Sequence, residues 1–522
     1  MFRCLRPIVL ILSFVASFSF TLSAQETADT GWRISPNRIN IQMGADRPLQ
    51  LLDDNAQELH DAQWTVDNPD LADLNEEDGL MTLHAKAVGT VRVSATLNGE
   101  IRVRDIKIWS AVRPIPNGTT NWGLDPIGRE VGDLPAVPTG DGPSIYSLEQ
   151  TANGDTYLRA DQDNGIQSWT WLMPEKTHDV ELICGDWLGG ALISATNAAS
   201  YTLYAVGKDG KLRWQHTSTG LRKGLAISTD HIVYLLNQSP EGTATSLTAF
   251  DEAAGTEVFE LPVPASEDRF VNLKQDGAAF TCTATSASTP ARTFVSRVMV
   301  NMDGFAYIAF TQNDRKIGTA KCKPGSAVNP ADISLTRNES LILWQIHQDG
   351  TYRSILVEHY KGEQPVIAPI TTLSPTNALM TDNLNGTLIP VQSSHQSSWA
   401  GTTSAADEFV YRVDEEGEVA FKYPLPKYTG ALHDDMVIGT DDTVFATRGG
   451  LLIAFSARTG KDAWRWDSNL PEISVLAALT HGRCLVQTDT AVVEVESSTK
   501  SKELTKGKIM MDWQGHMYRK HN

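Results

Sequence analysis

Cysteine is scarce in this sequence: 522 residues include only Cys4, Cys184, Cys282, Cys322 and Cys484. Their separations match no metal-ligand spacing, and no Cys-x-x-Cys-His motif for covalent haem is present. Cys282 and Cys322 lie beside segments rich in serine, threonine, alanine and proline. In an oxidising compartment these two could form a disulfide, although spacing alone does not prove it. Cys184 and Cys484 lie in strand patterns, which predicts buried free thiols.

Long apolar runs are also missing, apart from one at the N-terminus. Two arginines precede an apolar run over residues 8–20, and small residues lead up to Ala24. This pattern is typical of a secretory signal peptide spanning residues 1–24, and the run is short for a membrane span. Gln25 follows the expected cleavage site, so no cysteine is there to carry a lipid. We expect an exported protein, periplasmic or extracellular, that is soluble after signal cleavage and has no membrane span.

The sequence has fewer basic than acidic residues, 44 against 63. The formal net charge is −19 at pH 7, and removal of residues 1–24, which hold two arginines and no acid, takes it to −21. Such a charge argues against nucleic acid or an anionic membrane surface as a partner. We expect a protein or another cell-envelope or extracellular ligand, whose identity the sequence leaves open together with the oligomeric state.

What the sequence does contain is a repeated phrase. In Leu452–Trp466 an apolar strand leads into a turn that ends at a glycine, and an aromatic residue stands four positions later. Glycine supplies the positive φ that a tight hairpin turn needs. The turn glycines are Gly165, Gly210, Gly255, Gly350, Gly417 and Gly460, and the aromatic residues are Trp169, Trp214, Phe259, Phe421 and Trp464. The copy at Gly350 lacks its aromatic residue, and Lys500 replaces the glycine in a weak last copy.

The spacing of these turns predicts the architecture. Successive turn positions are 45, 45, 95, 67, 43 and 40 residues apart, and four of these intervals fit a four-stranded propeller blade. A single sheet of this kind cannot bury both faces, so the copies must pack on one another. We predict an all-β fold with seven blades. Eight blades are the alternative, if the 95-residue interval holds a degenerate blade over residues 270–285.

The phrase aliphatic-x-Ala-x-Asp-x-x-x-Gly-x-x-x-Trp resembles the repeat of pyrroloquinoline-quinone-like (PQQ-like) β-propellers, the quinoprotein alcohol dehydrogenase-like superfamily. The resemblance covers residues 144–522. It implies that the aromatic residues after the turns dock flat against the neighbouring blade. Residues 507–519 repeat the strand–turn–strand form of the blades, and we expect them to complete the blade begun near residue 157 and so close the ring.

Residues 32–109 have a different pattern, in which Val91, Val93 and Ala95 alternate with polar residues as in a half-buried strand. The stretch resembles the bacterial immunoglobulin-like group 2 (BIG2) domain. The matching motifs are Trp64, Asn68-Pro69, Gly79-Leu80, Ala87 and Gly89-Thr90. The resemblance implies a small β-sandwich that serves as a spacer or a surface-binding module, and we favour a spacer. Residues 110–143, rich in proline and glycine, are predicted to be a linker.

Acidic residues are the most frequent candidates for chemistry. Most recur at turn positions, where an aspartate bonds its own backbone; they are Asp161, Asp163, Asp209, Asp251, Asp349 and Asp414. Two clusters of mixed polarity, His433-Asp434-Asp435 and His395–Trp399, are predicted to be loops, and either could face the central funnel. Solvated loops without a function are the simpler interpretation.

Two function classes remain. The first is an exported non-catalytic binding or scaffold protein that uses the propeller as an interaction platform, and we identify no catalytic residue for it. The second is a quinone-dependent periplasmic dehydrogenase acting on an alcohol or sugar. For this class the resemblance implies bound PQQ and calcium. Such dehydrogenases often carry vicinal cysteines near the cofactor, and this sequence has none. The sequence therefore favours the first class, with no cofactor and no metal.

Overall fold

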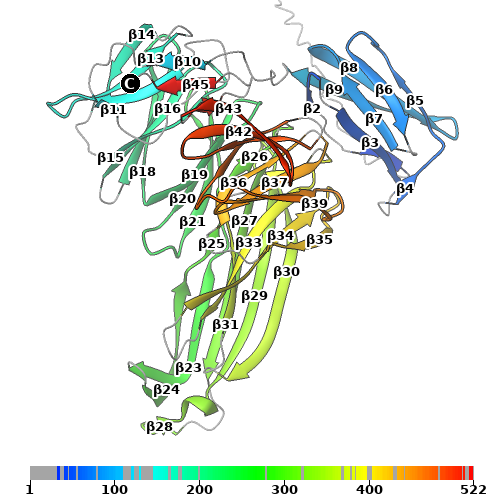
Figure 1. Cartoon of the computed structure of the whole chain (residues 1–522). Coiled ribbons are helices and arrows are strands. Elements are labelled where there is room, and N and C mark those ends of the chain that lie inside the picture. Colours follow the sequence, from blue (N-terminus) through cyan, green and yellow to red (C-terminus); the bar gives the residue numbers. More distant parts are fainter. Residues whose placement is uncertain are drawn as a thin grey trace, which may run out of the picture.

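The computed structural model describes residues 32–35, 40–44, 46–53, 57–77, 80–109, 119–122, 129–130, 145–162, 166–174, 179–197, 200–276, 279–301, 303–318, 323–365, 370–376, 379–382, 384–396, 403–426, 432–439, 441–479, 482–507, 509–511 and 517–520. The regular elements over these ranges are strands, apart from a single 3-10 turn at Pro330–Asp332. The predicted all-β class is therefore confirmed. None of the described residues belongs to a helix long and apolar enough to cross a bilayer. Figure 1 shows a separate N-terminal lobe, residues 32–109, beside a larger propeller-like part that begins at residue 119.

Two sheets packed face to face make up the N-terminal lobe. One has the strand order β1 (Trp32–Ser35), β3 (Asp46–Asp53), β7 (Leu80–Ala85) and β6 (Ala72–Glu77), with β4 (Glu58–Leu59) also paired to β3. The other has the order β2 (Asn40–Gln42), β9 (Glu100–Trp109), β8 (Gly89–Leu97) and β5 (Gln63–Val66). Val91, Val93 and Ala95 of β8 are all buried, as their alternation predicted, and Leu49 and Leu83 of the facing sheet are buried with them.

Sheets built from consecutive antiparallel strands make up most of the propeller-like part. Their strand orders follow the sequence. In chain order the four-stranded sheets are β11 (Arg129–Glu130), β12 (Ile145–Gln150), β13 (Thr156–Asp161) and β14 (Gln167–Leu172); β15 (Asp179–Gly185), β16 (Ala191–Asn197), β17 (Ser200–Val206) and β18 (Leu212–Thr219); β19 (Leu221–Ile227), β20 (Ile232–Gln238), β21 (Thr245–Asp251) and β22 (Glu257–Pro262); β36 (Leu432–Ile438), β37 (Thr443–Arg448), β38 (Leu451–Ser456) and β39 (Asp462–Asp467); and β40 (Ser474–Ala478), β41 (Cys484–Gln487), β42 (Ala491–Ser497) and β43 (Lys500–Lys506). The second and third strands of each sheet are the most buried, as in β17 compared with β18.

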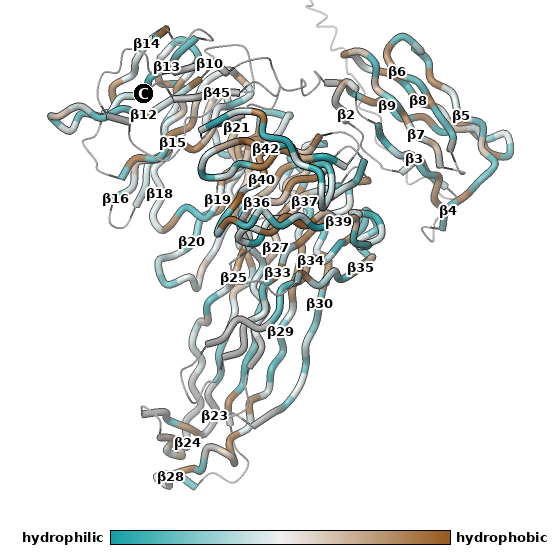
Figure 2. The backbone as a smooth tube through the Cα atoms, viewed as in Figure 1, coloured by the Kyte–Doolittle hydropathy of each residue, from teal (hydrophilic) through white to brown (hydrophobic). Residues whose placement is uncertain are grey.

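Two larger sheets lie between the third and the last two of these. The first contains β23 (Ser266–Asp276), β24 (Ala279–Ala291), β25 (Phe294–Val295), β26 (Met299–Val300), β27 (Ala306–Gly318), β28 (Ala327–Val328), β29 (Ser334–Ile346) and β30 (Tyr352–Pro365). The second contains β31 (Ile370–Pro375), β32 (Met380–Thr381), β33 (Thr387–Gln396), β34 (Thr403–Val413) and β35 (Val419–Pro424). In Figure 1 the strands around β23, β29 and β30 run well beyond the body of the molecule. Along β29 buried and exposed residues alternate, and Figure 2 shows hydrophilic and hydrophobic colours mixed along it.

The 95-residue interval does not hold a blade of its own, so the interpretation of residues 270–285 as a degenerate blade is wrong. The β23–β24 hairpin instead pairs in parallel with the far end of β27, from Glu267 opposite Asp314 to Phe270 opposite Ile317. Arg315 stabilises this pairing by donating two hydrogen bonds, each of 2.6 Å, to the Asp268 carboxylate. The hairpin is therefore an added edge to an existing sheet, because the unusually long β27 offers unpaired backbone beyond β25 and β26.

The two ends of the propeller-like part meet in a small sheet. In it β45 (Met517–Lys520) pairs with β44 (Met510–Met511) and, in parallel, with β10 (Thr119–Trp122). The expectation that residues 507–519 complete the sheet begun near residue 157 is wrong for the strands described. That sheet takes β11 and β12 from the preceding chain, since Ile145–Gln150 is buried throughout and pairs along the whole of β13. Both β10 and β11 fall within the predicted linker, at the edges of their sheets.

One contact recurs between successive sheets. Trp169 lies against Gly210 of the next sheet, Trp214 against Gly255, Phe259 against Gly350, and Phe421 against Gly460. The indole Nε1 of Trp214 also donates to the carbonyl of Glu252, at 2.8 Å. Trp464 packs against the core that its own sheet shares with β41 and β42. In these four sheets the turn glycine thus contacts the aromatic side chain of the preceding sheet.

An arginine takes the aromatic position at one junction. The copy at Gly350 has Ser354 four residues on, so no aromatic ring reaches the following turn. Arg353 reaches it instead and donates to the carbonyl oxygens of Glu415, at 3.0 Å, and Glu416. A β-carbon on Gly417 would lie 2.6 Å from an Nη atom of Arg353. Of the predicted turn glycines, Gly165 lies outside the described residues.

Candidate functional site

The N-terminal lobe is held on the propeller-like part by a buried arginine. Arg47 of β3 is only 7% exposed. Its Nη2 donates to Asn385 Oδ1 at 3.0 Å and lies 3.5 Å from Asp303 Oδ2, and Asp303 is also buried. Asp303 and Asn385 occupy the turns that precede β27 and β33, so one side chain of the lobe joins two sheets of the propeller-like part.

Two further contacts link the end of β1 to the turn between β34 and β35. Arg33 Nη2 lies 2.5 Å from Glu416 Oε1, and the Ser35 hydroxyl donates to Glu415 Oε2, also at 2.5 Å. Residues that are more than 300 positions apart in the sequence are therefore neighbours here. Together with Arg47, these contacts fix how the lobe sits on the hairpin turns.

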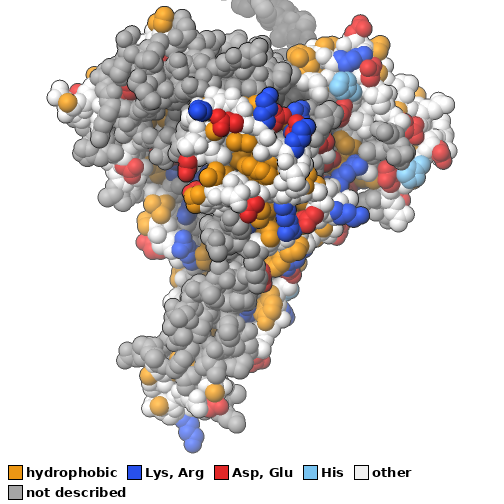
Figure 3. Space-filling model, viewed as in Figure 1, with side chains coloured by type: hydrophobic (Ala, Val, Ile, Leu, Met, Phe, Trp, Pro, Cys, Tyr) orange, Lys and Arg blue, Asp and Glu red, His pale blue; other side chains and the backbone are white. Residues whose placement is uncertain are grey.

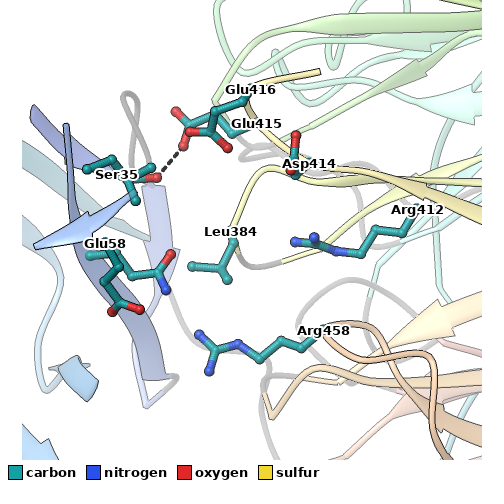
Figure 4. A pocket seen from close by; sticks show the side chains of 10 residues that line it. Ser35, Glu58, Leu384, Arg412, Asp414, Glu415, Glu416 and Arg458 are labelled. Atoms are coloured by element: carbon teal, nitrogen blue, oxygen red, sulfur yellow. Dashed lines mark hydrogen bonds between the residues drawn. The ribbon is translucent and has the colours of Figure 1, made fainter. Parts of the chain in front are cut away.

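A cavity of about 310 Å³ remains between the two parts. The lobe contributes Ser35, Gln50, Leu52 and Glu58, and the turns of the propeller-like part contribute Leu384, Arg412, Asp414, Glu415, Glu416 and Arg458. Figure 4 shows the guanidinium groups of Arg412 and Arg458 extending from the propeller-like part into this space, with Glu58 facing them from the lobe. The cavity is thus lined largely by charged groups.

Asp382 organises the turn beneath the cavity. Its Oδ1 accepts the backbone N–H groups of Leu384, at 2.9 Å, and Gly386, at 2.8 Å. Its Oδ2 accepts a hydrogen bond from Arg412 Nε at 2.6 Å. One carboxylate therefore shapes the turn that carries Asn385 and also sets the direction of the Arg412 guanidinium.

A second cavity, of about 460 Å³, lies within the lobe itself. Leu49, Leu51, Trp64 and Met81 give it an apolar floor, and its rim includes Glu58 and Glu76. Glu58 thus borders both cavities. On the face shown in Figure 3 acidic and basic side chains of the lobe are mixed, without a large area of one sign.

Two buried acids lie away from these cavities, and one of them, Glu252, joins two neighbouring sheets. The Glu252 carboxylate is fully buried, accepts the backbone N–H of Trp187 at 2.8 Å, and lies 2.6 Å from His231 Nδ1. Asp186, also fully buried, pairs with Arg213. Burial raises the pKa of both carboxyl groups; the hydrogen bond from His231 to Glu252 and the charge of Arg213 beside Asp186 oppose this effect in part.

The raised pKa of Glu252 predicts a pH-dependent stability. Because the folded carboxyl group takes up a proton at a higher pH than the unfolded one, the folded state holds more protons between the two pKa values. The free energy of unfolding should therefore fall as pH rises from about 4.5 through the folded pKa. We expect Glu252→Gln to flatten this fall, as measured by urea unfolding across the acidic range. Glu260→Gln, at an exposed position of β22, is the control, and equal pH profiles for the two variants would count against the explanation.

The structure describes three of the four cysteines that follow the expected signal peptide. Cys282 is disulfide-bonded; Cys322 lies outside the described residues, so the pairing of these two stays a prediction. Cys184 and Cys484 are free thiols, and Cys484 is buried. Burial raises the pKa of the Cys184 thiol to about 12 and that of Cys484 as well, so neither is poised as a nucleophile.

Most of the predicted turn aspartates accept a hydrogen bond from the backbone of their own turn. Oδ1 of Asp209, Asp251, Asp349 and Asp414 accepts a backbone N–H two to four residues further on. Asp161 differs, because it is buried at the end of β13 and pairs with Arg159 at 2.7 Å, and Asp163 lies outside the described residues. His433, Asp434 and Asp435 belong to strand β36 and His395 to β33, so the prediction that these are loops is wrong for their backbone. Residues 397–399 lie outside the described part.

No cavity between the two parts was predicted. Of its arginines, Arg412 lies in the repeat copy before Gly417, and Arg458 belongs to the turn Arg458-Thr459-Gly460, but neither was singled out as a site residue. A charged residue beside a recurrent turn was the only available signal. Within the described ranges no group of three or more histidine, cysteine or acidic residues is arranged to hold a metal ion.

Comparison with known proteins gives fold-level similarity. No protein-family model matches the chain, and no curated protein matches its sequence. One similar solved structure is virginiamycin B lyase from Staphylococcus aureus, with 11% sequence identity over 69% of this chain and 94% of that one and a TM-score of 0.32. Another is dipeptidyl peptidase 4 from Porphyromonas gingivalis, with 11% identity over 76% of this chain and 58% of that one and a TM-score of 0.41. A third is the β-propeller domain of the Trilobed protease from Pyrococcus furiosus, with 8% identity over 72% of this chain and 98% of that one and a TM-score of 0.33.

Proposed function

We propose that the chain is an exported, non-catalytic binding or scaffold protein, whose propeller-like part is the interaction platform and whose N-terminal lobe is a fixed arm on it. The observation that carries the proposal is the contact of Arg47 with Asp303 and Asn385. A buried charge held by partners on two sheets resists sliding of the lobe, because any displacement would leave that charge without compensation. The two parts then present one composite surface rather than two independent modules.

Finer assignments belong to the same proposal. We propose PQQ-like repeats for the propeller-like part and a BIG2 fold for the lobe. The recurrent seating of an aromatic side chain on the next turn glycine supports the former. We also propose seven blades, formed by the five four-stranded sheets and the two larger ones, with the small sheet of β10, β44 and β45 placed between the first and last blades. Export is proposed from residues 1–24, which lie outside the described residues.

Affinity capture from the cell-envelope fraction tests the function. Immobilised mature protein should retain a partner that, once purified, re-forms a complex of defined stoichiometry in sedimentation experiments. The same preparation is supplied with PQQ and calcium and assayed for dye-linked oxidation of alcohols and sugars. Turnover with a bound chromophore, in the absence of any reconstituted complex, would overturn the proposal in favour of a quinone-dependent dehydrogenase.

A further inference from the structure

The cavity between the lobe and the propeller-like part has the size and chemistry of a small-ligand site. Its volume of about 310 Å³ is at the lower end of the roughly 300–1,000 Å³ typical of pockets for small molecules. It is bordered by side chains from both parts of the chain, and such boundaries between structural units are frequent ligand sites. The occupant should therefore be no larger than a short peptide.

One wall of the cavity offers hydrogen-bond donors. Arg458 Nε lies 3.8 Å from Asp442 Oδ2, but its Nη2 is buried and has no hydrogen-bond partner among the described residues. A buried donor left unsatisfied costs about 1–3 kcal/mol, so this atom favours an acceptor in the cavity. Arg412 extends into the same space with its Nε held by Asp382. A carboxylate matches the geometry of such guanidinium groups.

The remaining charged groups exclude a simple anion. Four acids line the cavity against two arginines. Glu415 and Glu416 are engaged by Ser35 and Arg33, whereas Glu58 is exposed to the space on the lobe side. An anion alone would meet this acidic excess, and a cation alone would leave Arg458 Nη2 without an acceptor. A ligand with both an ammonium and a carboxylate group satisfies both walls.

We propose that this cavity binds a zwitterionic ligand of the size of a dipeptide. Its carboxylate contacts Arg458 and Arg412, and its ammonium group contacts Glu58 and the acidic turn at Asp414. This site goes beyond the proposed scaffold function and is independent of it, because a protein partner can be captured whether or not the cavity is filled. Since the ligand touches both parts, its binding also stabilises the docked lobe.

Calorimetric titration of the mature protein with L-alanyl-L-alanine tests the proposal. We expect saturable binding that weakens at least about 10-fold when either end of the dipeptide is blocked, by N-acetylation or by C-terminal amidation, since each removes one charged contact. Arg458→Gln should weaken binding by a similar factor. Arg465→Gln is the matched control, because Arg465 is exposed on β39 and pairs with Asp462 at 2.8 Å; its affinity should be unchanged.

Glu58→Gln provides a second variant on the opposite wall, at an exposed position where folding is not at risk. It should weaken the dipeptide more than it weakens the N-acetylated analogue. Absence of saturable binding to the wild-type protein, or equal affinities for the free and blocked dipeptides, would mean that the cavity is a solvent-filled gap. Either result would leave the captured protein partner unaffected, so the two proposals fail separately.

Discussion

Gly255→Ala is expected to lower the free energy of unfolding by about 3 kcal/mol, because two costs add at this position. Gly255 has a φ of +67°, a conformation that costs an alanine about 1–2 kcal/mol. The new β-carbon would also lie 2.4 Å from Cγ of Trp214. Trp214 cannot easily move away, since it is 7% exposed and its indole Nε1 is bonded to the Glu252 carbonyl.

Urea unfolding of the wild type and the variant measures this cost. Gly154→Ala is the matched control, because Gly154 has a φ of +80° and no heavy atom within 4 Å of its β-carbon position. Only the backbone cost of about 1 kcal/mol should remain there. If the two substitutions cost the same, the aromatic contact between sheets contributes nothing, and the packing explanation for the repeat is wrong.

The turn glycines and aromatic residues could be predicted because local rules place them. A hairpin turn needs a positive φ, and the β-strand period sends the side chain four residues later to a fixed face. Both facts depend only on nearby sequence, so they repeat with each sheet. The exception at Arg353 shows the limit, because its replacement of an aromatic ring depends on the carbonyl groups of Glu415 and Glu416 in the next sheet.

Strand pairing between distant segments could not be predicted. The β23–β24 hairpin carries a serine- and threonine-rich alternation that suits a strand, yet nothing in it specifies the parallel edge of β27 as its partner. The same holds for the parallel pairing of β45 with β10, which joins segments almost 400 residues apart. Backbone hydrogen bonds carry no sequence signature, so only the existence of such strands, and not their partners, follows from pattern.

The cavity between the two parts escaped prediction for a related reason. Neither Arg412 nor Arg458 carries a sequence signal for a site, and the cavity is bordered by residues of the lobe as well as by these turns. Asp382 illustrates this, because a turn aspartate is predictable, whereas its second oxygen directing Arg412 is not. Local chemistry therefore identifies the turns, and docking of the lobe converts them into a site.

Arg47→Met is expected to release the lobe. Removing one member of a buried charged contact costs about 3 kcal/mol, because the other charge remains buried. Asp303 is 1% exposed and lies 3.5 Å from Arg47 Nη2, so this cost falls on the docked state. At 1.4 kcal/mol for each factor of ten, the population with an undocked lobe should increase on the order of 100-fold.

Hydrogen exchange at the turn beneath the lobe reports this release. The amides of Leu384 and Gly386 donate to Asp382 next to the Asn385 contact, and they should exchange faster in Arg47→Met, with a larger radius of gyration in solution scattering. Arg92→Met is the control, since Arg92 pairs with Asp105 on an exposed face of the same lobe, and exposed pairs contribute little. Unchanged exchange and scattering in Arg47→Met would show that the lobe is not held by this arginine, and the rigid composite surface on which the scaffold proposal rests would then have to be abandoned.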